Sequence, residues 1–290
     1  PGRFRVWTLP IPQSYRGGGA YGSNYLMVHG IDQVGGEHPN PLQRWNEYLG
    51  EGTETYIDWH RFLQDPAVVE QPEGQALTFQ SVPGLIDAAN VRYVVSMAPL
   101  SVPGWTEVYR GSALVYENTR SMERAFLAPS AAAAPLDRTL ARMESAAWNP
   151  REVAYVEPDA GVALPAEPLV GSAGVVEYTP DRVVVSTRAN RAALLVLADN
   201  YYPGWRATVD GSEAPVLRAN YVFRGVVVPA GAHRVVFTYE PDDLRTGFYL
   251  SLATLLLLGG AGAASVLAHR RRAHADGAGA ASSGSPAGPA

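Results

Sequence analysis

The chain of 290 residues contains no cysteine. Structural disulfides and thiolate chemistry are therefore excluded, and a domain exposed to an oxidising compartment has to be stabilised by its hydrophobic core alone. Histidine is sparse as well: the chain has six, and none stands in the His-Glu-x-x-His pattern of zinc proteases. One loop carries His29, Asp32, Glu37 and His38, but these residues lack a tight ligand spacing. We therefore expect no metal site and no cofactor.

Positive charge is not in excess. The chain has 23 lysines and arginines against 28 aspartates and glutamates, for a formal net charge of -5. No basic patch interleaved with aromatic residues occurs, so we expect no nucleic-acid partner. The N-terminus has no initiator Met and neither the basic nor the apolar segment of a signal peptide. An external domain must still be carried across a membrane, so either a signal peptide was removed or the chain is the tail of a longer membrane protein. We expect the second: the sequence reads as starting within a longer protein.

Two common catalytic motifs are also missing. No Gly-x-Ser-x-Gly occurs, so the sequence shows no serine-hydrolase nucleophile. The glycine-rich run at residues 17–22 lacks the Lys-Ser/Thr of a phosphate-binding loop and the strand-to-helix context of a dinucleotide fold. Neither hydrolysis of that kind nor nucleotide binding is indicated.

A long uncharged run is the strongest positive signal. Residues 246–268, 23 in all, include no Asp, Glu, Lys, Arg or His. As a helix this run would be about 34 Å long, enough to cross a hydrocarbon core of about 30 Å. A buried helix of a soluble protein is the alternative, but such helices seldom lack a polar stripe over this length. We therefore predict a transmembrane helix, with the lipid bilayer as its partner.

The charges that flank this run predict its orientation. Three arginines follow it at residues 270–272, whereas Glu240, Asp242 and Asp243 precede it with only Arg245 against them. Under the positive-inside rule the C-terminus is cytoplasmic and residues 1–245 are extracytoplasmic, on the outer side of the cell membrane.

Residues 1–128 alternate between helical and strand patterns. Pro41 opens a helix over residues 42–49 that Gly50 would end. Two more helices are expected at residues 55–64 and 83–90. Runs rich in β-branched and aromatic residues predict strands at residues 4–8, 91–96, 105–109 and 113–117. We expect a mixed α/β region.

The remainder of the chain divides into four parts. Residues 129–173 are predicted to form a short helix and a linker, and residues 174–245 a β-sandwich, because short strands there alternate with turns such as Asp210-Gly211. Residues 246–268 follow as the transmembrane helix. Residues 269–290, which are rich in Gly, Ala, Ser and Pro, predict a disordered cytoplasmic tail. The expected fold class is therefore α+β: a mixed α/β extracytoplasmic region, an all-β sandwich and one C-terminal transmembrane helix.

Aromatic and polar residues gather in the loops of the first region. Aromatic faces with amide and carboxylate neighbours suit sugar rings, whose C–H faces stack while their hydroxyls are hydrogen-bonded. The alternative is that these aromatic residues only pack the loops of the domain. The candidate substrate-binding residues are Tyr21, Asn24, Tyr25, Asp32, Glu37, His38 and Trp45.

The second half of the chain resembles a known family. The run Asp199-Asn-Tyr-Tyr-Pro-Gly-Trp205, together with Ala219-Asn-Tyr-Val-Phe-Arg-Gly225 and the strand up to Pro241, is similar to the C-terminal end of YfhO-type bacterial membrane proteins. In that family the run passes into a last membrane helix, as it does here at Thr246. Upstream, the runs Gly30-Ile-Asp-Gln-Val-Gly-Gly36 and Ala89-Asn-Val-Arg-Tyr-Val-Val-Ser96 resemble the family's extracytoplasmic region.

This resemblance implies a polytopic protein with the architecture of glycosyltransferases that use lipid-carried sugars. Its upstream transmembrane helices would be absent from this chain. Its substrates would be a sugar on a polyprenyl phosphate and a glycan of the cell envelope. The catalytic carboxylate of that class usually lies in an early external loop between membrane helices, so no catalytic residue of this chain is assigned.

Two other functions are compatible with the residues. One is a membrane-anchored, non-enzymatic β-sandwich module that binds glycans or a surface protein. The other is a hydrolase that uses carboxylates of the first region, such as Asp58 and Asp65, although the sequence fixes no geometry for such a pair. The number of hydrophobic spans in the parent gene discriminates the first of these from the glycosyltransferase.

Overall fold

A computed structural model describes residues 3–8, 25–35, 42–50, 77–78, 84–145 and 147–281. The helix expected at residues 55–64 lies outside these ranges, as do the candidates Tyr21, Asn24, Glu37 and His38. The chain separates into two compact units, Pro1–Glu240 and Pro241–Ala290, which are described in turn.

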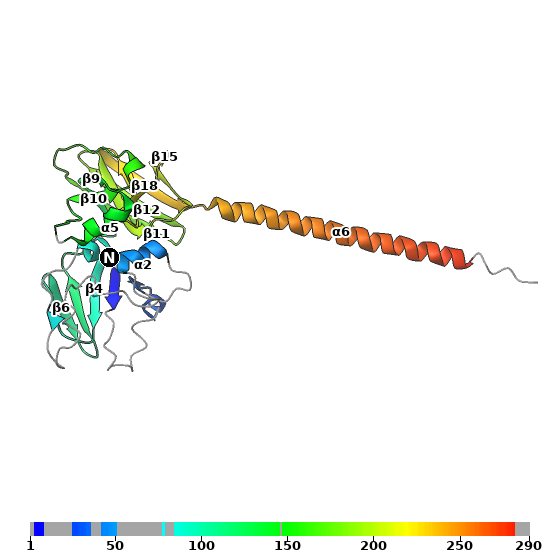
Figure 1. The fold of residues 1–290 in the computed structure, drawn as a ribbon, viewed down its shortest axis with the longest axis horizontal. Helices are drawn as coiled ribbons and strands as arrows, with labels where there is room; N and C mark the ends of the chain where they lie inside the picture. Colours follow the sequence, from blue (N-terminus) through cyan, green and yellow to red (C-terminus); the bar gives the residue numbers. More distant parts are fainter. Residues whose placement is uncertain are drawn as a thin grey trace, which may run out of the picture. The chain divides into compact units, whose positions relative to one another are not determined.

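The N-terminal part of the first unit contains a five-stranded mixed sheet in the order β2-β1-β4-β7-β6. Its strands β4 and β6 are labelled in Figure 1. Strands β1 and β4 are parallel, so a crossover connection has to join them. Strands β4, β7 and β6 are paired antiparallel to one another in that order. The strands are β1 (Arg5–Thr8), β2 (Asp32–Gln33), β4 (Val91–Ser96), β6 (Trp105–Arg110) and β7 (Leu114–Asn118). A two-stranded sheet pairs β3 (Leu77–Thr78) with β5 (Leu100–Ser101).

Three short helices accompany these strands: α1 (Tyr25–Val28), α2 (Gln43–Leu49) and α4 (Gly84–Ala88). Helix α2 ends at Gly50, which has φ of 106° and bonds back to the carbonyls of Asn46 and Glu47. A residue without a Cβ adopts this left-handed conformation at low cost. The helix end predicted from the sequence is therefore confirmed.

A second, six-stranded sheet has the order β8-β13-β17-β16-β10-β9. Its strands β8, β9 and β10 come from before residue 174, ahead of the stretch whose strand pattern predicted the sandwich. Helix α5 (Leu136–Glu144) lies between β9 and β10, and the 3-10 helix η3 (Pro158–Ala160) follows β10. The strands are β8 (Ala125–Ala128), β9 (Ser130–Ala133), β10 (Val153–Val156), β13 (Ala193–Asn200), β16 (Leu217–Ala219) and β17 (Phe223–Val228).

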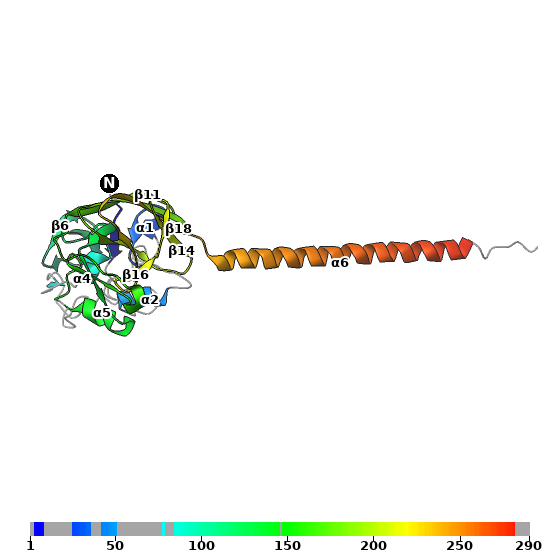
Figure 2. The ribbon, with the colours of Figure 1, turned by 90° about the horizontal axis from the view of Figure 1, so that it is seen from above.

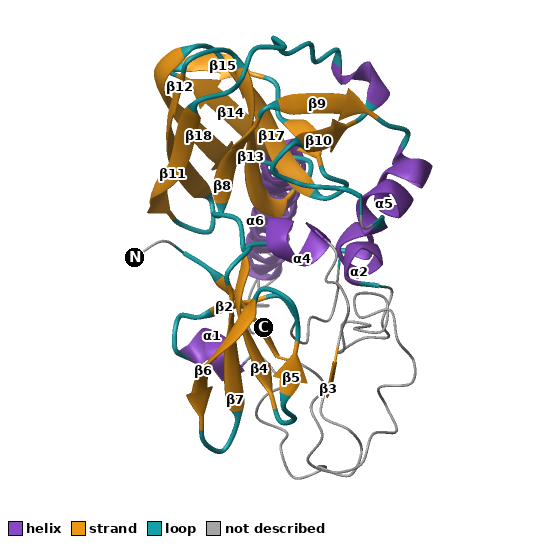
Figure 3. Cartoon of the chain, turned by 90° about the vertical axis from the view of Figure 1, so that its left-hand side faces the viewer, coloured by secondary structure: helices purple, strands orange, loops and turns teal. Residues whose placement is uncertain are grey.

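The third sheet is antiparallel throughout, in the order β11-β12-β18-β14-β15 (Figure 3). The predicted hairpin at Asp210-Gly211 joins β14 to β15, and both turn residues have positive φ, as a tight hairpin requires. The strands are β11 (Gly171–Tyr178), β12 (Arg182–Ala189), β14 (Trp205–Val209), β15 (Ser212–Ala214) and β18 (Gly231–Tyr239).

The six-stranded sheet is covered on both faces. On one face, Leu195 and Leu197 of β13 pack with Val185 and Phe237 of the third sheet. On the other face, Leu194 and Val196 belong to a core shared with the N-terminal region. A strand buried on both sides needs a continuous apolar run, and this accounts for Ala-Leu-Leu-Val-Leu in β13.

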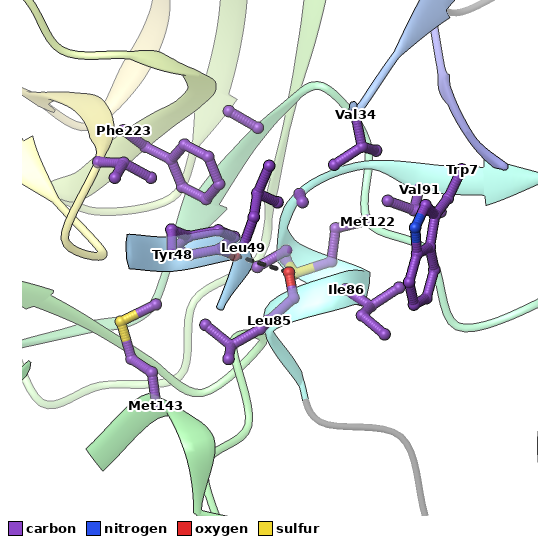
Figure 4. Close-up of a cluster of buried hydrophobic side chains, with 14 of the residues drawn as sticks. Trp7, Val34, Tyr48, Leu49, Leu85, Ile86, Val91, Met122, Met143 and Phe223 are labelled. Carbon is purple, nitrogen blue, oxygen red and sulfur yellow. Dashed lines mark hydrogen bonds between the residues drawn. The ribbon is translucent and has the colours of Figure 1, made fainter. Parts of the chain in front are cut away.

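The shared core brings the N-terminal helices onto this second face (Figure 4). Tyr48 of α2 packs against Phe223 of β17, with ring centroids 5.4 Å apart. Its hydroxyl donates a hydrogen bond of 2.6 Å to the carbonyl of Leu85 in α4. Met143 of α5 is fully buried in the same core. The predicted α+β class, with a mixed region followed by a β-sandwich, is confirmed.

The second unit consists of α6 (Asp242–Ala281), a continuous helix (Figures 1 and 2). By length and composition its segment Asp242–Ala268 could cross a membrane, and none of its most apolar window is buried against the protein. The helix continues beyond this segment, so the disordered tail predicted from residue 269 is wrong for residues 269–281. Alanine and arginine have high helix propensity, and no proline occurs before Pro286 to end the helix. Residues 282–290 lie outside the described ranges.

Glycine spacing in β11 yields a test of the sandwich. A Cβ on Gly171 would lie 2.5 Å from the carbonyl oxygen of Arg188, whereas a Cβ on Gly174 would meet nothing within 4 Å. We expect Gly171→Ala to lower the free energy of unfolding by about 1–3 kcal/mol, because the paired strands must move apart. Gly174→Ala is the matched control and should be neutral or stabilise by up to about 1 kcal/mol. Urea unfolding of the chain in detergent, followed by tryptophan fluorescence, measures both; equal effects would contradict the close approach.

Candidate functional site

Two of the described candidate residues, Asp32 and Trp45, lie near the buried Arg5 of β1. Asp32 is in β2, Trp45 is in α2, and Tyr25 begins α1. The guanidinium of Arg5 lies 5.4 Å from the ring centre of Trp45. Asp32 forms an ion pair with Arg124 at 3.5 Å. Arg124 and Arg5 in turn both contact one further carboxylate, that of Asp199. The structure therefore brings Asp32 and Trp45 into one neighbourhood.

The shared carboxylate belongs to Asp199, near the end of β13. Arg5 approaches its Oδ1 at 3.2 Å, Arg124 approaches the same oxygen at 2.6 Å, and Arg224 approaches Oδ2 at 3.1 Å. All four side chains are at most 8% exposed. We call these four residues the Asp199 cluster.

The cluster joins elements that are far apart in the sequence. Arg5 comes from β1, Arg124 directly precedes β8, and Arg224 comes from β17. Strand β13 has an irregular register against β17 between Leu197 and Asn200, so Asp199 departs from the regular alternation of that strand. This one side chain connects the N-terminal sheet with the six-stranded sheet.

The positive charges of the cluster find further partners around its rim. Arg5 donates to the carbonyl of Ala89 at 2.8 Å, at the end of α4. Arg124 donates to the hydroxyl of Tyr178 at 3.0 Å. The guanidinium of Arg224 lies 3.7 Å from the ring centre of Trp205, where its Nε and Nη1 are buried without a hydrogen-bond partner among the described residues. A cation over an indole face is stabilised by the ring quadrupole, so Trp205 takes the place of a second anion.

Electrostatics keep the cluster ionised. Burial alone would raise the pKa of Asp199, but Arg124, Arg5 and Arg224 together outweigh it and hold that pKa below its ordinary value of 3.8. Burial, and after it the neighbouring Arg124, lowers the pKa of Arg5 to about 10, which still leaves the group cationic at neutral pH. The carboxylate is 6% exposed and enclosed by guanidinium groups, so its chemistry suits holding the two sheets together.

Trp45 has packing contacts of its own. Its ring is stacked on Tyr48 with an interplanar angle of 3° and a centroid separation of 5.6 Å, and its indole N–H donates to the carbonyl of Val34 at 3.3 Å. Asp32 is one-third exposed and faces two guanidinium groups, those of Arg3 at 3.6 Å and Arg124. Whether either side chain binds a sugar stays a prediction.

A more accessible group of polar and aromatic residues lies between α2 and the six-stranded sheet. Tyr221 donates a hydrogen bond to the carboxylate of Glu47 in α2. Glu157 is bracketed by two guanidinium groups, those of Arg218 at 3.0 Å and Arg44 at 3.5 Å, and is 39% exposed. We call these five residues the α2 surface. Glu157 and Arg44 are the more exposed members, at 39% and 35%, whereas Arg218, Glu47 and Tyr221 are half-buried. Charged groups at a partly exposed surface beside an aromatic ring suit recognition of a hydroxyl-rich ligand.

Tyr221 of the α2 surface and the residue before it, Asn220, are two consecutive non-glycine residues with left-handed backbone. Asn220 and Tyr221 have φ of 46° and 72°, although neither is glycine. Such conformations are costly and persist where the surroundings fix them. Asn220 is fixed by its side chain, whose Oδ1 accepts from the amide of Tyr155 at 2.9 Å, and this places the Tyr221 ring beside α2. The sequence analysis missed this surface, because nothing in Ala-Asn-Tyr marks a left-handed pair.

Metal binding has no support in the described ranges. Within them no group of three or more His, Asp or Glu side chains is placed to hold an ion. Of the loop residues considered for a metal, Asp32 is paired with arginines, and Glu37 and His38 lie outside the ranges.

Removal of the central anion should be costly. In Asp199→Asn three buried guanidinium groups would share no full negative charge, so we expect the free energy of unfolding to fall by about 3–5 kcal/mol. The control is Glu213→Gln, an exposed partner of Arg206 at 4.0 Å, which should change it by less than about 0.5 kcal/mol. Urea unfolding in detergent measures both, and a small effect of Asp199→Asn would contradict the assigned role.

The lowered pKa of Asp199 also predicts a pH dependence. Because the folded pKa lies below the unfolded value of about 3.9, the stability contributed by the carboxylate is complete above that value and is lost as the pH falls through the folded pKa. The stability difference between the wild type and Asp199→Asn should therefore be constant from about pH 5 to 7 and shrink below about pH 4. Unfolding free energies at a series of pH values test this; a difference that grows on acidification would contradict it.

Comparison with known proteins gives one match. Residues 172–251 match the family model described as Bacterial membrane protein YfhO. The match is 80 residues long, from 172 through 251, and it includes Asp199, Trp205, Tyr221 and Arg224. No curated protein and no solved structure matches the chain. The resemblance predicted from the sequence is thereby confirmed over this stretch: from β11 into α6, the chain is similar to bacterial membrane proteins of the YfhO type.

Proposed function

We propose that this chain is the extracytoplasmic C-terminal portion, with the final helix, of a polytopic membrane glycosyltransferase-like protein. The protein would transfer a sugar from a polyprenyl-phosphate carrier to a polymer of the cell envelope. The observation that carries the proposal is the YfhO match, which runs without a break from β11 of the third sheet into α6. Residues 1–245 would lie outside the cell membrane, since the arginines at 270–272 favour a cytoplasmic C-terminus.

In this proposal the portion recognises substrate and supports the membrane core, while the chemistry takes place elsewhere in the parent protein. The one fully buried carboxylate of the Asp199 cluster is surrounded by guanidinium groups and is enclosed, which does not suit a general base. The α2 surface supports the recognition role, because it combines carboxylates, guanidinium groups and a phenol, and Glu157 and Arg44 are more than one-third exposed. It adjoins Trp45, and the remaining sugar-binding candidates precede α2 in the chain.

The composition of α6 supports a place in a helix bundle. Gly259, Gly260 and Gly262 lie in its apolar segment, and a Cβ on any of them would meet nothing within 4 Å. Small residues allow the backbones of membrane helices to approach closely. A helix that only anchors a domain has no need of such a surface, so these glycines are compatible with upstream helices as partners.

Deletion of the complete gene tests the proposed activity. We expect one sugar decoration of the envelope to be lost, and to return when the intact gene is supplied. Glycan composition analysis by mass spectrometry is the measurement. An unchanged envelope, together with binding of envelope glycan by the purified chain, would instead favour the non-enzymatic, membrane-anchored module.

A pair of surface variants tests recognition by the α2 surface. Arg44→Ala removes one of the two guanidinium groups at Glu157, whereas Arg138→Ala, on the exposed side of α5, is the matched control. Loss of one charge-assisted contact of about 1.5 kcal/mol corresponds to a roughly tenfold weaker affinity. We expect that weakening for glycan binding by Arg44→Ala and none for Arg138→Ala. Equal binding by the two variants would remove the α2 surface from the proposal.

A further inference from the structure

Three aromatic residues gather at one end of the third sheet, the one in the order β11-β12-β18-β14-β15. Trp205 begins β14, and Tyr239 ends β18 directly opposite it in the register, with ring centroids 5.3 Å apart. Tyr202 lies in the loop before β14, with its ring 6.5 Å from that of Tyr239. We call these three residues the aromatic end. Tyr202 is 47% exposed and the other two are half-buried, so the group presents aromatic surface to its surroundings.

The aromatic end is held in place from beneath and from its sides. Arg224 of the Asp199 cluster lies under the ring of Trp205. The amide of Tyr239 donates to the carbonyl of Asp181 at 2.8 Å, and the amide of Glu240 donates to Gly204 at 2.7 Å. The order therefore extends through the last residue of the first compact unit.

Covalent continuity limits how far this end can be from the start of α6. Tyr239 precedes Asp242 by three residues, which span at most about 11 Å of extended chain. Phe248 and Tyr249, both more than 60% exposed, follow within two turns of the helix, about 10 Å along its axis. Aromatic residues at the start of an apolar span are typical of the membrane–water interface.

We propose that the aromatic end lies in the lipid head-group layer of the bilayer that α6 crosses. Tyrosine suits this layer because its ring is apolar and its hydroxyl finds polar partners there. Tyr202 and Tyr239 contact the lipid, and Trp205 fixes them to the Asp199 cluster. The inference rests on the proposed function insofar as α6 has to span a membrane, and it adds the surface with which the extracytoplasmic portion meets the bilayer.

The absence of cysteine makes a direct test practical, because any introduced cysteine is the only labelling site. Three single variants, Tyr202→Cys, Val170→Cys and Leu256→Cys, are spin-labelled in the full chain and reconstituted in nanodiscs of bacterial phospholipid. Val170 is 71% exposed and directly precedes β11, at the end of that strand that is opposite to the aromatic end. The length of β11, roughly 25 Å at the usual rise per residue, separates the two ends. Leu256 lies in the apolar segment of α6. Collision with oxygen, which enters the bilayer, is compared with collision with a water-soluble nickel chelate. Circular dichroism verifies that each variant is folded.

The three labels separate the possible results. We expect the label at 256 to collide mainly with oxygen, the label at 170 mainly with nickel, and the label at 202 to show an intermediate, head-group ratio. If 256 is in the bilayer while 202 resembles 170, the head-group contact is refuted and the membrane span stands. If 256 also resembles 170, the span itself fails, and the proposed function with it. A label at 202 shielded from both reagents would indicate contact with a second copy and would overturn the inference as well.

Discussion

The fold depends on one buried carboxylate. Asp199 is the only full anion that all three enclosed arginines of its cluster share, and each arginine comes from a different strand or strand boundary. A guanidinium group cannot shed its charge at neutral pH, so burial of Arg5, Arg124 and Arg224 requires compensating partners. Besides the shared anion, these are Asp32 and the Tyr178 hydroxyl for Arg124, the ring of Trp205 for Arg224 and the carbonyl of Ala89 for Arg5. The mutual arrangement of the N-terminal sheet and the sandwich follows from where these groups meet.

The six-stranded sheet forms the apolar counterpart of this constraint. Because β13 is buried on both faces, it takes part in two cores at once, one with the third sheet and one with α2, α4 and α5. The chain has no cysteine, so no covalent link shares this task. The polar cluster at the end of β13 and the apolar cores along it act on the same strand, and the two therefore reinforce each other.

Local patterns predicted much of this fold, because their causes are local. The end of α2 at Gly50 and the turn at Asp210-Gly211 each follow from a few adjacent residues. The same holds for α5, the short helix predicted within residues 129–173. Strands β8 and β9 are short and rich in alanine, so their place in the six-stranded sheet depends on pairing with partners far along the chain. The helical continuation to Ala281 was missed since glycine and alanine together suggested a flexible tail.

The candidate site was predicted less well than the fold. Asp32 and Trp45 were chosen as candidates from their residue types, and their binding role stays a prediction. Nothing in a single sequence pairs Arg5 with a carboxylate 194 residues away or aligns Tyr221 with Glu47 across 174 residues. Such contacts are set by tertiary packing and have no periodic signature. The positive φ of Tyr221 was likewise invisible, since left-handed conformations are expected at glycine or asparagine.

The distance in sequence between Arg5 and Asp199 has a consequence for biosynthesis. Synthesis proceeds from the N-terminus at about 5–20 residues per second, so 194 residues correspond to roughly 10–40 s. During that interval β1 exists without the strand that completes its surroundings, and its guanidinium stays hydrated. The N-terminal sheet therefore reaches its final packing only after β13 and β17 have emerged, which makes the folding of this region late and cooperative instead of sequential.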